Sequence, residues 1–406
     1  MHVDAGRVIG ELRALDARSG GRRVAWTATW ARERERFTAG LLAELPGARA
    51  ETDEAGNGWI ALPGEVSETI VVGSHLDCVP DGGWLDGCLG VLAGAEILRA
   101  AATAGGARRT LALVDWADEE GARFGHSLLG SSAACGLLDL GAARALTDAE
   151  GVPLPRALAE HGVELEAMPQ AARRLEPVSA YVELHIEQGP VLEQEGRPAC
   201  AVDGCLGVRR HRLAFAGEVA HAGATPMALR RDPVLAAART ALAAREAAQA
   251  TGGLATAGGI GAVPGIPTAV AREARLTLDL RHRDGGRLEA LERRVLAAAR
   301  AAAEDNGCTL AAEPLWAIAP VAFDSGLVAL AAEHAGAPPL TSGPLHDAAS
   351  LQRAGVPAAM IFVRTRGGVS HSRAEDAAED DLRRGIEALA AVTAALTRGP
   401  GPPARS

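Results

Sequence analysis

The sequence contains no lysine, and all 41 of its basic residues are arginine. This absence excludes enzymes that form a Schiff base through lysine and enzymes that hold phosphate with the lysine of a phosphate-binding loop. No stretch approaches the roughly 18 uncharged apolar residues that a membrane-spanning helix needs. The start of the chain also lacks a basic stretch followed by an apolar segment. We therefore expect a cytoplasmic protein that does not associate with a membrane.

Disulfide bonds and nucleic-acid binding are not expected either. The six cysteines form no Cys-x-x-Cys pair, and a chain of 406 residues needs no disulfide framework, so we expect reduced thiols. A formal net charge of −10 argues against a general nucleic-acid binder. The chain is 48% apolar and 23% charged, which is typical of a folded protein, and it is long enough for two domains.

Most of the chain alternates short apolar segments with Ala/Leu-rich helical segments. This pattern predicts an α/β fold with a mostly parallel sheet covered by helices. Strands are predicted at residues 69–73, 110–115, 180–184 and 358–363. Each is followed directly by polar residues and glycines, as expected of buried parallel strands that lead into functional loops at their carboxyl ends.

The pattern changes between about residues 207 and 319. It predicts a strand at 210–216, a helix that begins after Asp232, a strand at 274–281 and a helix at 287–306. Asp232 followed by proline is a typical helix start. We expect a small α+β domain at 207–319, inserted into a discontinuous catalytic domain at 1–206 and 320–399, with a flexible tail at 400–406.

Side chains that can bind metal follow the predicted strands. His75, Asp77, Asp81 and Asp86 lie in a glycine-rich loop after the first strand. An acid two residues after a histidine can orient the imidazole, and Asp86 comes from the next turn as a candidate bridging carboxylate. The alternative is an ordinary polar surface loop.

Two adjacent carboxylates, Glu119 and Glu120, follow the second predicted strand. Neighbouring residues of an extended segment point to opposite sides. One carboxylate can therefore bind metal while the other takes a proton from water, which is the division that hydrolysis requires. The alternative is a solvated acidic turn.

His185 ends a third predicted strand and His371 follows a fourth. A single histidine carries little information, but four strands that each deliver a histidine or an acid to one edge of a sheet are unlikely by chance, because open α/β sheets build their sites there. Together these residues form a plausible two-metal set with nitrogen and oxygen ligands: His75, Asp86, Glu120, His185 and His371.

With these residues, the chain resembles a known family, the amidase, hydantoinase and carbamoylase branch of the two-metal aminoacylase and carboxypeptidase superfamily. That branch includes N-carbamoyl-L-amino-acid hydrolases, allantoate amidohydrolase and β-ureidopropionase. HIEQGP separates it from the peptidases of the superfamily. The matching segments follow the family order over almost the whole chain: GSHLDCVPDGGWLDG, DEEGARFG, ELHIEQGPVLE, GEVAHAGATPM, LDLRH, SGPLHDAASL and GVSHSRAE.

The resemblance implies a role for each matching residue. The five candidate ligands would hold two divalent ions, bridged by Asp86, with Glu119 as general base and Asp77 orienting His75. Gln188 would face the amide or ureido group of the substrate. The remaining implied contacts are His221, which would stabilise the oxyanion, Arg281, which would clamp the substrate carboxylate, and His346, which with Asp347 matches a motif near the site.

Three features depart from the family pattern or stand outside it. Thr268 occupies the position where many members carry an asparagine beside the substrate, and a hydroxyl offers one donor where an amide offers two. We therefore expect intact metal chemistry and an altered specificity. His126 is expected to be an ordinary surface or packed histidine. Cys78 and Cys88 flank predicted site residues, and we expect them to be small buried residues rather than sites of oxidative inactivation.

We therefore expect a metal-dependent amidohydrolase that cleaves the C–N bond of an N-carbamoyl or related N-substituted L-amino acid, giving amino acid, ammonia and CO2. The alternatives are an allantoate-type amidohydrolase, a pathway-specific N-acyl amino acid deacylase, and a non-catalytic binding protein on the same fold. The expected partners are a small amide or ureido substrate with a carboxylate and, by resemblance, a second copy of the chain in a homodimer. Two divalent ions are expected per subunit, Zn or Mn, with Co or Ni as alternatives.

Overall fold

The computed structural model describes residues 1–398, so the tail expected at 400–406 lies outside the described residues. The chain divides into two compact units. Unit 1 comprises Met1–Asp203 together with residues 322–398, and unit 2 comprises Gly204–Val321. No helix among the described residues is long and apolar enough to cross a membrane.

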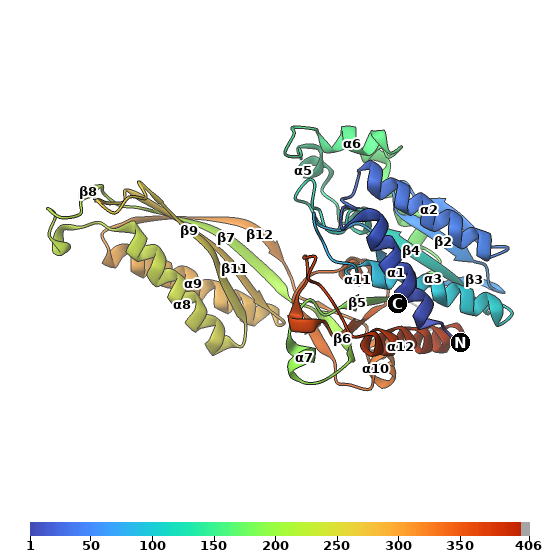
Figure 1. The fold of residues 1–406 in the computed structure, drawn as a ribbon. Coiled ribbons are helices and arrows are strands. Elements are labelled where there is room, and N and C mark those ends of the chain that lie inside the picture. The colour runs from blue at the N-terminus through green and yellow to red at the C-terminus, as the bar shows by residue number, and fades with distance from the viewer. Residues whose placement is uncertain (399–406) are drawn as a thin grey trace. The chain divides into compact units, whose positions relative to one another are not determined.

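Unit 1 is built on a mixed, centrally parallel sheet (Figure 1). The strands follow the order β1-β2-β4-β3-β5-β15-β6-β13, and β14 pairs with β6. The central strands β4, β3, β5 and β15 run parallel, whereas β1, β2 and β6 pair in antiparallel fashion. The strand bounds are β1 (Arg49–Thr52), β2 (Gly58–Leu62), β3 (Val66–His75), β4 (Arg109–Trp116), β5 (Val178–Ile186), β6 (Ala199–Cys205), β13 (Val321–Ala322), β14 (Leu340–Ser342) and β15 (Ala358–Val363).

The helices of unit 1 form two groups on this sheet. Helices α3, α10 and α12 contact the central strands, and α1 packs on α3 and α12. Helix α11 contacts β5, β15 and α4, and α4 packs on η1. The helix bounds are α1 (Ala5–Ser19), α2 (Ala28–Glu44), α3 (Cys88–Thr103), α4 (Leu129–Ala134), α5 (Leu140–Arg144), α6 (Leu154–Glu160), η1 (Leu165–Leu175), α7 (Val191–Gln194), α10 (Ser325–Ala335), α11 (Asp347–Arg353), η3 (Arg366–Gly368) and α12 (Glu379–Arg398).

The four strands predicted from the sequence lie within β3, β4, β5 and β15. Their apolar runs have no polar alternation because helices cover both faces of a parallel sheet, and every residue of β15 is buried. The parallel register pairs His75 with Trp116 and Phe362 with His185. The carboxyl ends of these strands therefore meet at one edge, which is where the loops with polar residues begin.

Unit 2 is an antiparallel sheet with two helices on one face. The strand order is β12-β7-β11-β9, and a separate two-stranded ribbon pairs β8 with β10. Asp232 accepts hydrogen bonds from two backbone amides at the start of α8, as its sequence context predicts. The bounds are β7 (Gly207–Ala216), β8 (Ala220–His221), η2 (Met227–Leu229), α8 (Pro233–Thr251), β9 (Leu254–Val263), β10 (Ala269–Val270), β11 (Glu273–His282), α9 (Gly285–Asp305) and β12 (Thr309–Ile318).

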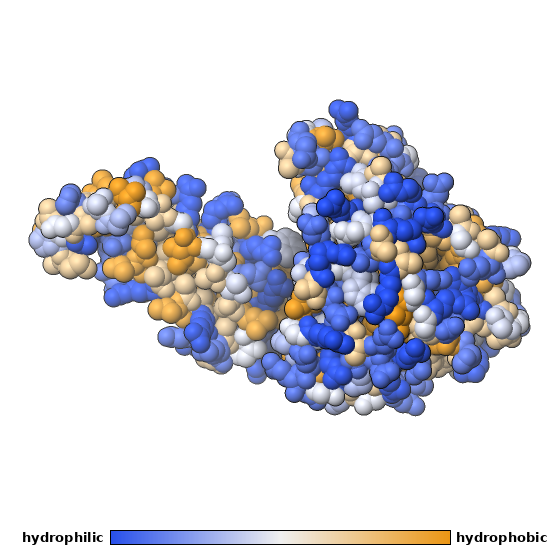
Figure 2. Space-filling view, viewed as in Figure 1, coloured by the Kyte–Doolittle hydropathy of each residue, from blue (hydrophilic) through white to orange (hydrophobic). Residues whose placement is uncertain are grey.

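The two faces of the unit 2 sheet differ in chemistry. Leu276, Leu278 and Leu280 of β11 are buried in a core with α8 and α9, while Asp279 and Arg281 lie on the opposite face. Exposed apolar side chains concentrate on this unit (Figure 2). All but three of the large apolar residues that are exposed among the described residues lie in unit 2: Val219, Met227, Leu229, Leu235, Leu242, Leu254, Ile260, Val263, Ile266, Leu315 and Trp316.

Candidate active site

His75 is the last residue of β3 and is 1% exposed. Its Nδ1 lies 3.1 Å from the backbone oxygen of Asp77, so Nδ1 carries the proton and Nε2 offers its lone pair. Gly87, at the start of α3, packs on the imidazole face with a φ of 65°. A Cβ at this position would lie 2.4 Å from His75 Nε2, so the close approach requires glycine.

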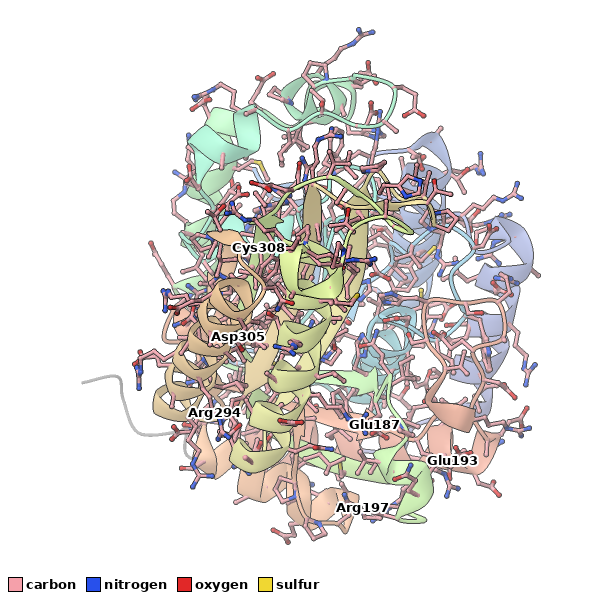
Figure 3. All side chains as sticks on the ribbon, turned by 90° about the vertical axis from the view of Figure 1, so that its left-hand side faces the viewer. Glu187, Glu193, Arg197, Arg294, Asp305 and Cys308 are labelled. Carbon is pink, nitrogen blue, oxygen red and sulfur yellow. The ribbon has the colours of Figure 1, made fainter. Side chains whose placement is uncertain are left out.

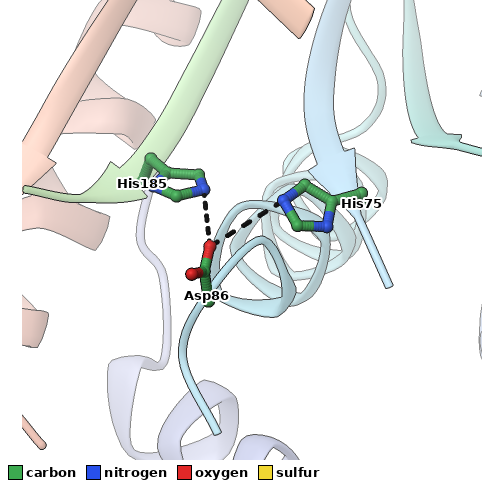
Figure 4. A group of neighbouring side chains, drawn as sticks. All are labelled: His75, Asp86 and His185. Atoms are coloured by element: carbon green, nitrogen blue, oxygen red, sulfur yellow. Dashed lines mark ion pairs between the residues drawn. The ribbon is translucent and has the colours of Figure 1, made fainter. Parts of the chain in front are cut away.

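Asp86 lies between three imidazoles. Its Oδ1 is 3.1 Å from Nε2 of His185 and 3.9 Å from Nε2 of His75 (Figure 4). Its Oδ2 is 3.3 Å from Nε2 of His371. Asp86 is 3% exposed. The two oxygens of one buried carboxylate therefore face two different groups of nitrogen ligands.

The histidine on β5 is oriented in the same manner as His75. Nδ1 of His185 is 2.9 Å from the backbone oxygen of Ile186, which directs Nε2 towards Asp86. Behind it lies His346, whose ring centroid is 4.4 Å from that of His185. His346 is 2% exposed, and its Nε2 is 3.1 Å from Oγ of Ser342. The structure thus places His346 against a candidate ligand rather than on an open surface.

The two adjacent acids after β4 diverge as the sequence predicts. Glu120 Oε2 is 3.4 Å from Nε2 of His371, whereas Glu119 Oε2 is 3.6 Å from Nε2 of His75. The carboxylate of Asp77 accepts the backbone amides of both, at 3.3 Å for Glu119 and 3.1 Å for Glu120. One loop thus presents one carboxylate to each of two imidazoles.

The residues present fit two divalent cations. The ligand atoms of His75, Asp86 and His185 lie within 4.8 Å of one another, and so do those of Asp86, Glu120 and His371. His75 Nε2, His185 Nε2 and Glu120 Oε1 are buried without a hydrogen-bond partner, as expected of atoms that are placed to coordinate an ion. Imidazole and carboxylate suit zinc, manganese, cobalt and nickel.

A third cluster of side chains that can bind metal lies close by, but its carboxylate already accepts hydrogen bonds from the protein. Glu183, His185 and His346 lie within 4.8 Å of one another. However, Glu183 accepts hydrogen bonds from Oγ of Ser74 at 2.7 Å and from the backbone amide of Ala348 at 3.1 Å. Its carboxylate therefore ties strands and α11 together beneath the site.

The excess of buried acids perturbs ionisation throughout the site. Burial and the charge of Asp86 raise the pKa of Glu120 to about 8. The hydrogen bond to Asp86 raises the pKa of His371 to about 9. Burial disfavours the charged form of His185, but Asp86 outweighs this and raises the pKa of that imidazole to about 9. Protons thus offset a surplus of negative charge, which bound cations also offset.

Gln188 lies close to the same carboxylate. Its backbone has a φ of 59°, and its Nε2 donates to Oδ2 of Asp86 at 2.8 Å. Hydrogen bonds to two glutamates hold this loop. Glu187 accepts the backbone amides of Val191 and Leu192, both at 2.8 Å, and Glu193 accepts the backbone amide of Gly367 at 2.8 Å; both glutamates are labelled in Figure 3. The segment after His185 is therefore fastened to the segment before His371.

The other three substrate residues expected from the resemblance lie in unit 2. His221 is exposed on β8, and its neighbour Ala222 donates a backbone hydrogen bond to the oxygen of Thr268 at 3.0 Å. Arg281 lies near the end of β11, where its Nε donates to Oδ1 of Asp279 at 2.7 Å. Within this unit the structure brings His221 and Thr268 together, but not Arg281.

Sequence reasoning missed two residues of the His371 loop. Ser370 Oγ donates to Oδ2 of Asp86 at 2.8 Å, and Glu375 accepts the backbone amides of Leu85 and Asp86. Both residues lie in the segment GVSHSRAE. Their closeness in sequence to His371 is the feature that could have identified them as site residues. Two other sequence expectations concern packing: His126 is half-buried outside these ligand groups, and Cys78 and Cys88 are buried.

Comparison with known proteins agrees with this geometry. The model of the family described as Peptidase family M20/M25/M40 matches residues 71–395. The chain is 40% identical over 338 residues to an N-carbamoyl-L-amino acid amidohydrolase of Geobacillus stearothermophilus, covering 81% of this chain and 82% of that protein. It is 35% identical over 353 residues to an allantoate amidohydrolase of Bacillus subtilis, covering 84% and 85%. A crystal structure of a hydantoinase/carbamoylase family amidase from Burkholderia multivorans matches with a TM-score of 0.89 at 29% identity, covering 98% and 99%.

Proposed function

Because the chain belongs to peptidase family M20/M25/M40, we propose that it is a metal-dependent amidohydrolase that cleaves the C–N bond of an N-carbamoyl or related N-substituted L-amino acid. One observation carries this proposal: the buried carboxylate of Asp86 lies between two sets of nitrogen and oxygen ligands, with Glu119 beside them. The two ions would be held by five residues, of which Asp86 belongs to both groups: His75, Asp86, Glu120, His185 and His371.

When bound there, two divalent ions supply positive charge that polarises the substrate carbonyl and makes a water molecule more acidic. The chain provides the remaining chemistry. Glu119 is buried beside the ligand cluster, with Oε2 3.6 Å from Nε2 of His75. It takes a proton from the water that attacks the carbonyl carbon and gives a proton to the departing nitrogen. With a carbamoyl substrate, the products are the amino acid and a carbamate, which breaks down to ammonia and CO2.

We propose three substrate contacts. Gln188 faces the amide or ureido group, Arg281 offers a planar fork to the substrate carboxylate, and Thr268 borders the substrate in place of an amide side chain. The change from amide to hydroxyl affects which N-substituted amino acid binds best. We propose that His346 holds His185 in position, since it packs against that ring and is nearly inaccessible.

A homodimer is supported by two properties of unit 2. First, Glu273 and Arg281 lie near the two ends of β11 and are about 26 Å apart, because a strand rises about 3.3 Å per residue. His221 is still farther from Arg281, since it lies beyond the Glu273 end of β11, on the β8–β10 ribbon at the tip of the unit (Figure 1). One amino acid derivative is too short to reach both Arg281 and His221 of the same unit. Second, exposed apolar side chains concentrate on this unit. We infer that two copies associate and that one substrate uses both.

Two finer points stay predictions. The ligand types accept zinc, manganese, cobalt or nickel, with zinc or manganese as our choice. The cytoplasmic location also rests on the sequence alone.

An allantoate-type activity is the second candidate, because the relative of Bacillus subtilis carries that name. A pathway-specific deacylase for N-acyl amino acids would use the same residues. A non-catalytic binding protein is disfavoured because all five proposed ligands and the proposed base are present.

The test is hydrolysis of a substrate panel by metal-loaded protein. The panel holds N-carbamoyl, N-formyl and N-acetyl L-amino acids and allantoate, with ammonia and free amino acid measured in parallel because acyl substrates release no ammonia. We expect turnover of a carbamoyl substrate that Glu119→Gln reduces by about 10²–10⁴-fold. Glu65→Gln, at an exposed position before β3, serves as control. Silence of the wild type across the panel with two ions bound would overturn the proposal.

A further inference from the structure

We propose that Glu375 is a positioning residue that holds the backbone of the Asp86 turn so that Asp86 can serve both cation sites. This inference rests on the proposed two-metal function. Glu375 lies four residues after His371, in the loop before α12, and is 2% exposed. It therefore belongs to the segment that carries one candidate ligand while it contacts the segment that carries another.

Three consecutive residues of the Asp86 turn bond to Glu375. Oε1 of Glu375 accepts the backbone amide of Leu85 at 2.8 Å and that of Asp86 at 3.1 Å. The backbone oxygen of Glu375 accepts Nε1 of Trp84 at 3.0 Å. These contacts join parts of the chain that are 289 to 291 residues apart.

Ser370 lies between the second carboxylate oxygen of Glu375 and the side chain of Asp86. Oγ of Ser370 is 2.8 Å from Oδ2 of Asp86 and 3.2 Å from Oε2 of Glu375. A hydroxyl has one proton to donate, and the shorter distance assigns it to Asp86. Glu375 therefore acts on the bridging ligand through the backbone amides, while Ser370 bonds to the carboxylate of that ligand.

Gly83 shows how closely the two segments approach. A Cβ on Gly83 would lie 2.1 Å from Oε1 and 2.6 Å from Cβ of Glu375. Glycine at this position therefore provides the space that the Glu375 side chain occupies. The turn before Asp86 is shaped around this carboxylate.

Two buried carboxylates side by side repel each other, so the arrangement needs a reason beyond packing. The hydrogen bonds from Leu85 and Asp86 favour the carboxylate of Glu375 and anchor the turn at the residue that bridges the ions. Groups that orient metal ligands typically change metal affinity by about 10–100-fold when they are removed. We therefore expect Glu375 to act on metal binding more than on the fold.

Two variants separate the two backbone hydrogen bonds that Glu375 accepts, here called the clamp, from its negative charge. In Glu375→Gln the amide oxygen still accepts both backbone amides, so cation affinity is expected to stay within about threefold of the wild type. In Glu375→Ala the clamp is lost, and we expect the affinity for at least one of the two ions to fall by about 10–100-fold. The readouts are a Co²⁺ titration of metal-free protein against a competing chelator and the visible absorption spectrum of the bound Co²⁺.

Asp139→Ala is the matched control for the loss of two backbone hydrogen bonds. Oδ1 of Asp139 accepts two consecutive amides, from Gly141 at 2.9 Å and Ala142 at 3.0 Å, at the start of α5 in the same unit. A general loss of fold stability would lower Co²⁺ affinity in both alanine variants, whereas the proposed role lowers it in Glu375→Ala alone. Equal affinities of the wild type and Glu375→Ala would overturn the inference.

The outcome also separates this inference from the proposed function. Wild-type protein that binds no Co²⁺ would overturn the two-metal function and the inference together. Wild-type protein that binds two ions while Glu375→Ala does so equally well would overturn the inference alone. If Glu375→Ala does not fold, Glu375→Asp takes its place, because the shorter side chain keeps the charge but cannot reach both amides. Unchanged affinity in Glu375→Asp would then overturn the inference.

Discussion

The carboxylate of Asp77 accepts the backbone amide of Glu120 at 3.1 Å, so the loop after β3 fixes the loop after β4. The same carboxylate accepts the amide of Glu119 at 3.3 Å, and Asp77 is 1% exposed. His75 Nδ1 lies closer to the backbone oxygen of Asp77, at 3.1 Å, than to its carboxylate, at 3.6 Å. Asp77 therefore orients His75 through its backbone and the two acids through its side chain.

Replacing Asp77 with asparagine should lower both metal affinity and turnover by about 10–100-fold. An asparagine has one acceptor oxygen, so its NH2 group would face one of the two backbone amides that the carboxylate accepts. Metal content after dialysis and kcat of metal-saturated enzyme measure the two effects. Asp81→Asn, in the same loop with a side chain that is 72% exposed, is the control. Equal metal content and kcat in both variants would contradict this role.

Gly87→Ala should abolish binding at the His75 site. The new Cβ would lie about where the imidazole now packs, 2.4 Å from its Nε2, at a φ that disfavours any side chain. The expected readout is the loss of at least one bound ion per subunit, measured by elemental analysis, with a lower melting temperature. Gly10→Ala is the control, because Gly10 lies within α1 with no atom within 4 Å of an added Cβ, and alanine favours a helix. Two ions retained in Gly87→Ala would refute this account.

The part of the site that could be predicted from sequence is the part that lies at strand ends. His75 ends β3 and His185 is the next-to-last residue of β5, and apolar runs followed by polar residues mark the ends of such buried parallel strands in a sequence. Glu119 and Glu120 also approach different imidazoles, although they lie in a bend after the turn that follows β4 rather than in an extended segment. These predictions needed no knowledge of contacts between distant segments. The family resemblance then supplied roles that the residue pattern alone left open.

Contacts between distant segments account for what was missed. Glu375 contacts the Asp86 turn across about 290 residues, and no local pattern records such a pairing. His346 was expected to touch substrate, yet only the fold shows that it packs behind His185. Strands β9 and β12 were also not predicted. Strand β9 is glycine-rich and exposed along almost its whole length, so it lacks the apolar alternation that identifies a half-buried strand.

Asp279→Asn should lower the stability of unit 2 in a pH-dependent manner. Burial opposes the ionisation of Asp279, but hydrogen bonds from Arg281 and Arg210 outweigh it and hold the pKa below its ordinary value. A lowered pKa in the folded state stabilises the protein above pH 4 or so, and this stabilisation is lost as the pH falls through the folded-state pKa. We expect the variant to lose about 1–3 kcal/mol at pH 7.

Urea unfolding of both proteins at pH 7 and at about pH 3 measures that difference. The gap between wild type and Asp279→Asn should shrink in acid, because protonation of Asp279 progressively removes the negative charge that the variant lacks at every pH. Glu313→Gln is the control on the same sheet. The Glu313 side chain is 61% exposed, so its ion pair with Arg212 is expected to contribute little to stability. A gap that grows in acid would show that the sign of the pKa shift is wrong.

The thiols beside the candidate ligands should be protected in the folded protein. Cys78 and Cys88 are at most 1% exposed, and burial raises the pKa of Cys78 to about 11 and that of Cys88 to about 12, so little reactive thiolate forms at neutral pH. Both sulfurs also accept hydrogen bonds from Arg23, at 3.2 Å and 3.1 Å. A variant with Cys78→Ser and Cys88→Ser, whose hydroxyls can accept the same bonds, should therefore lose activity in peroxide as fast as the wild type. Resistance of the variant would show that oxidation reaches these buried sulfurs.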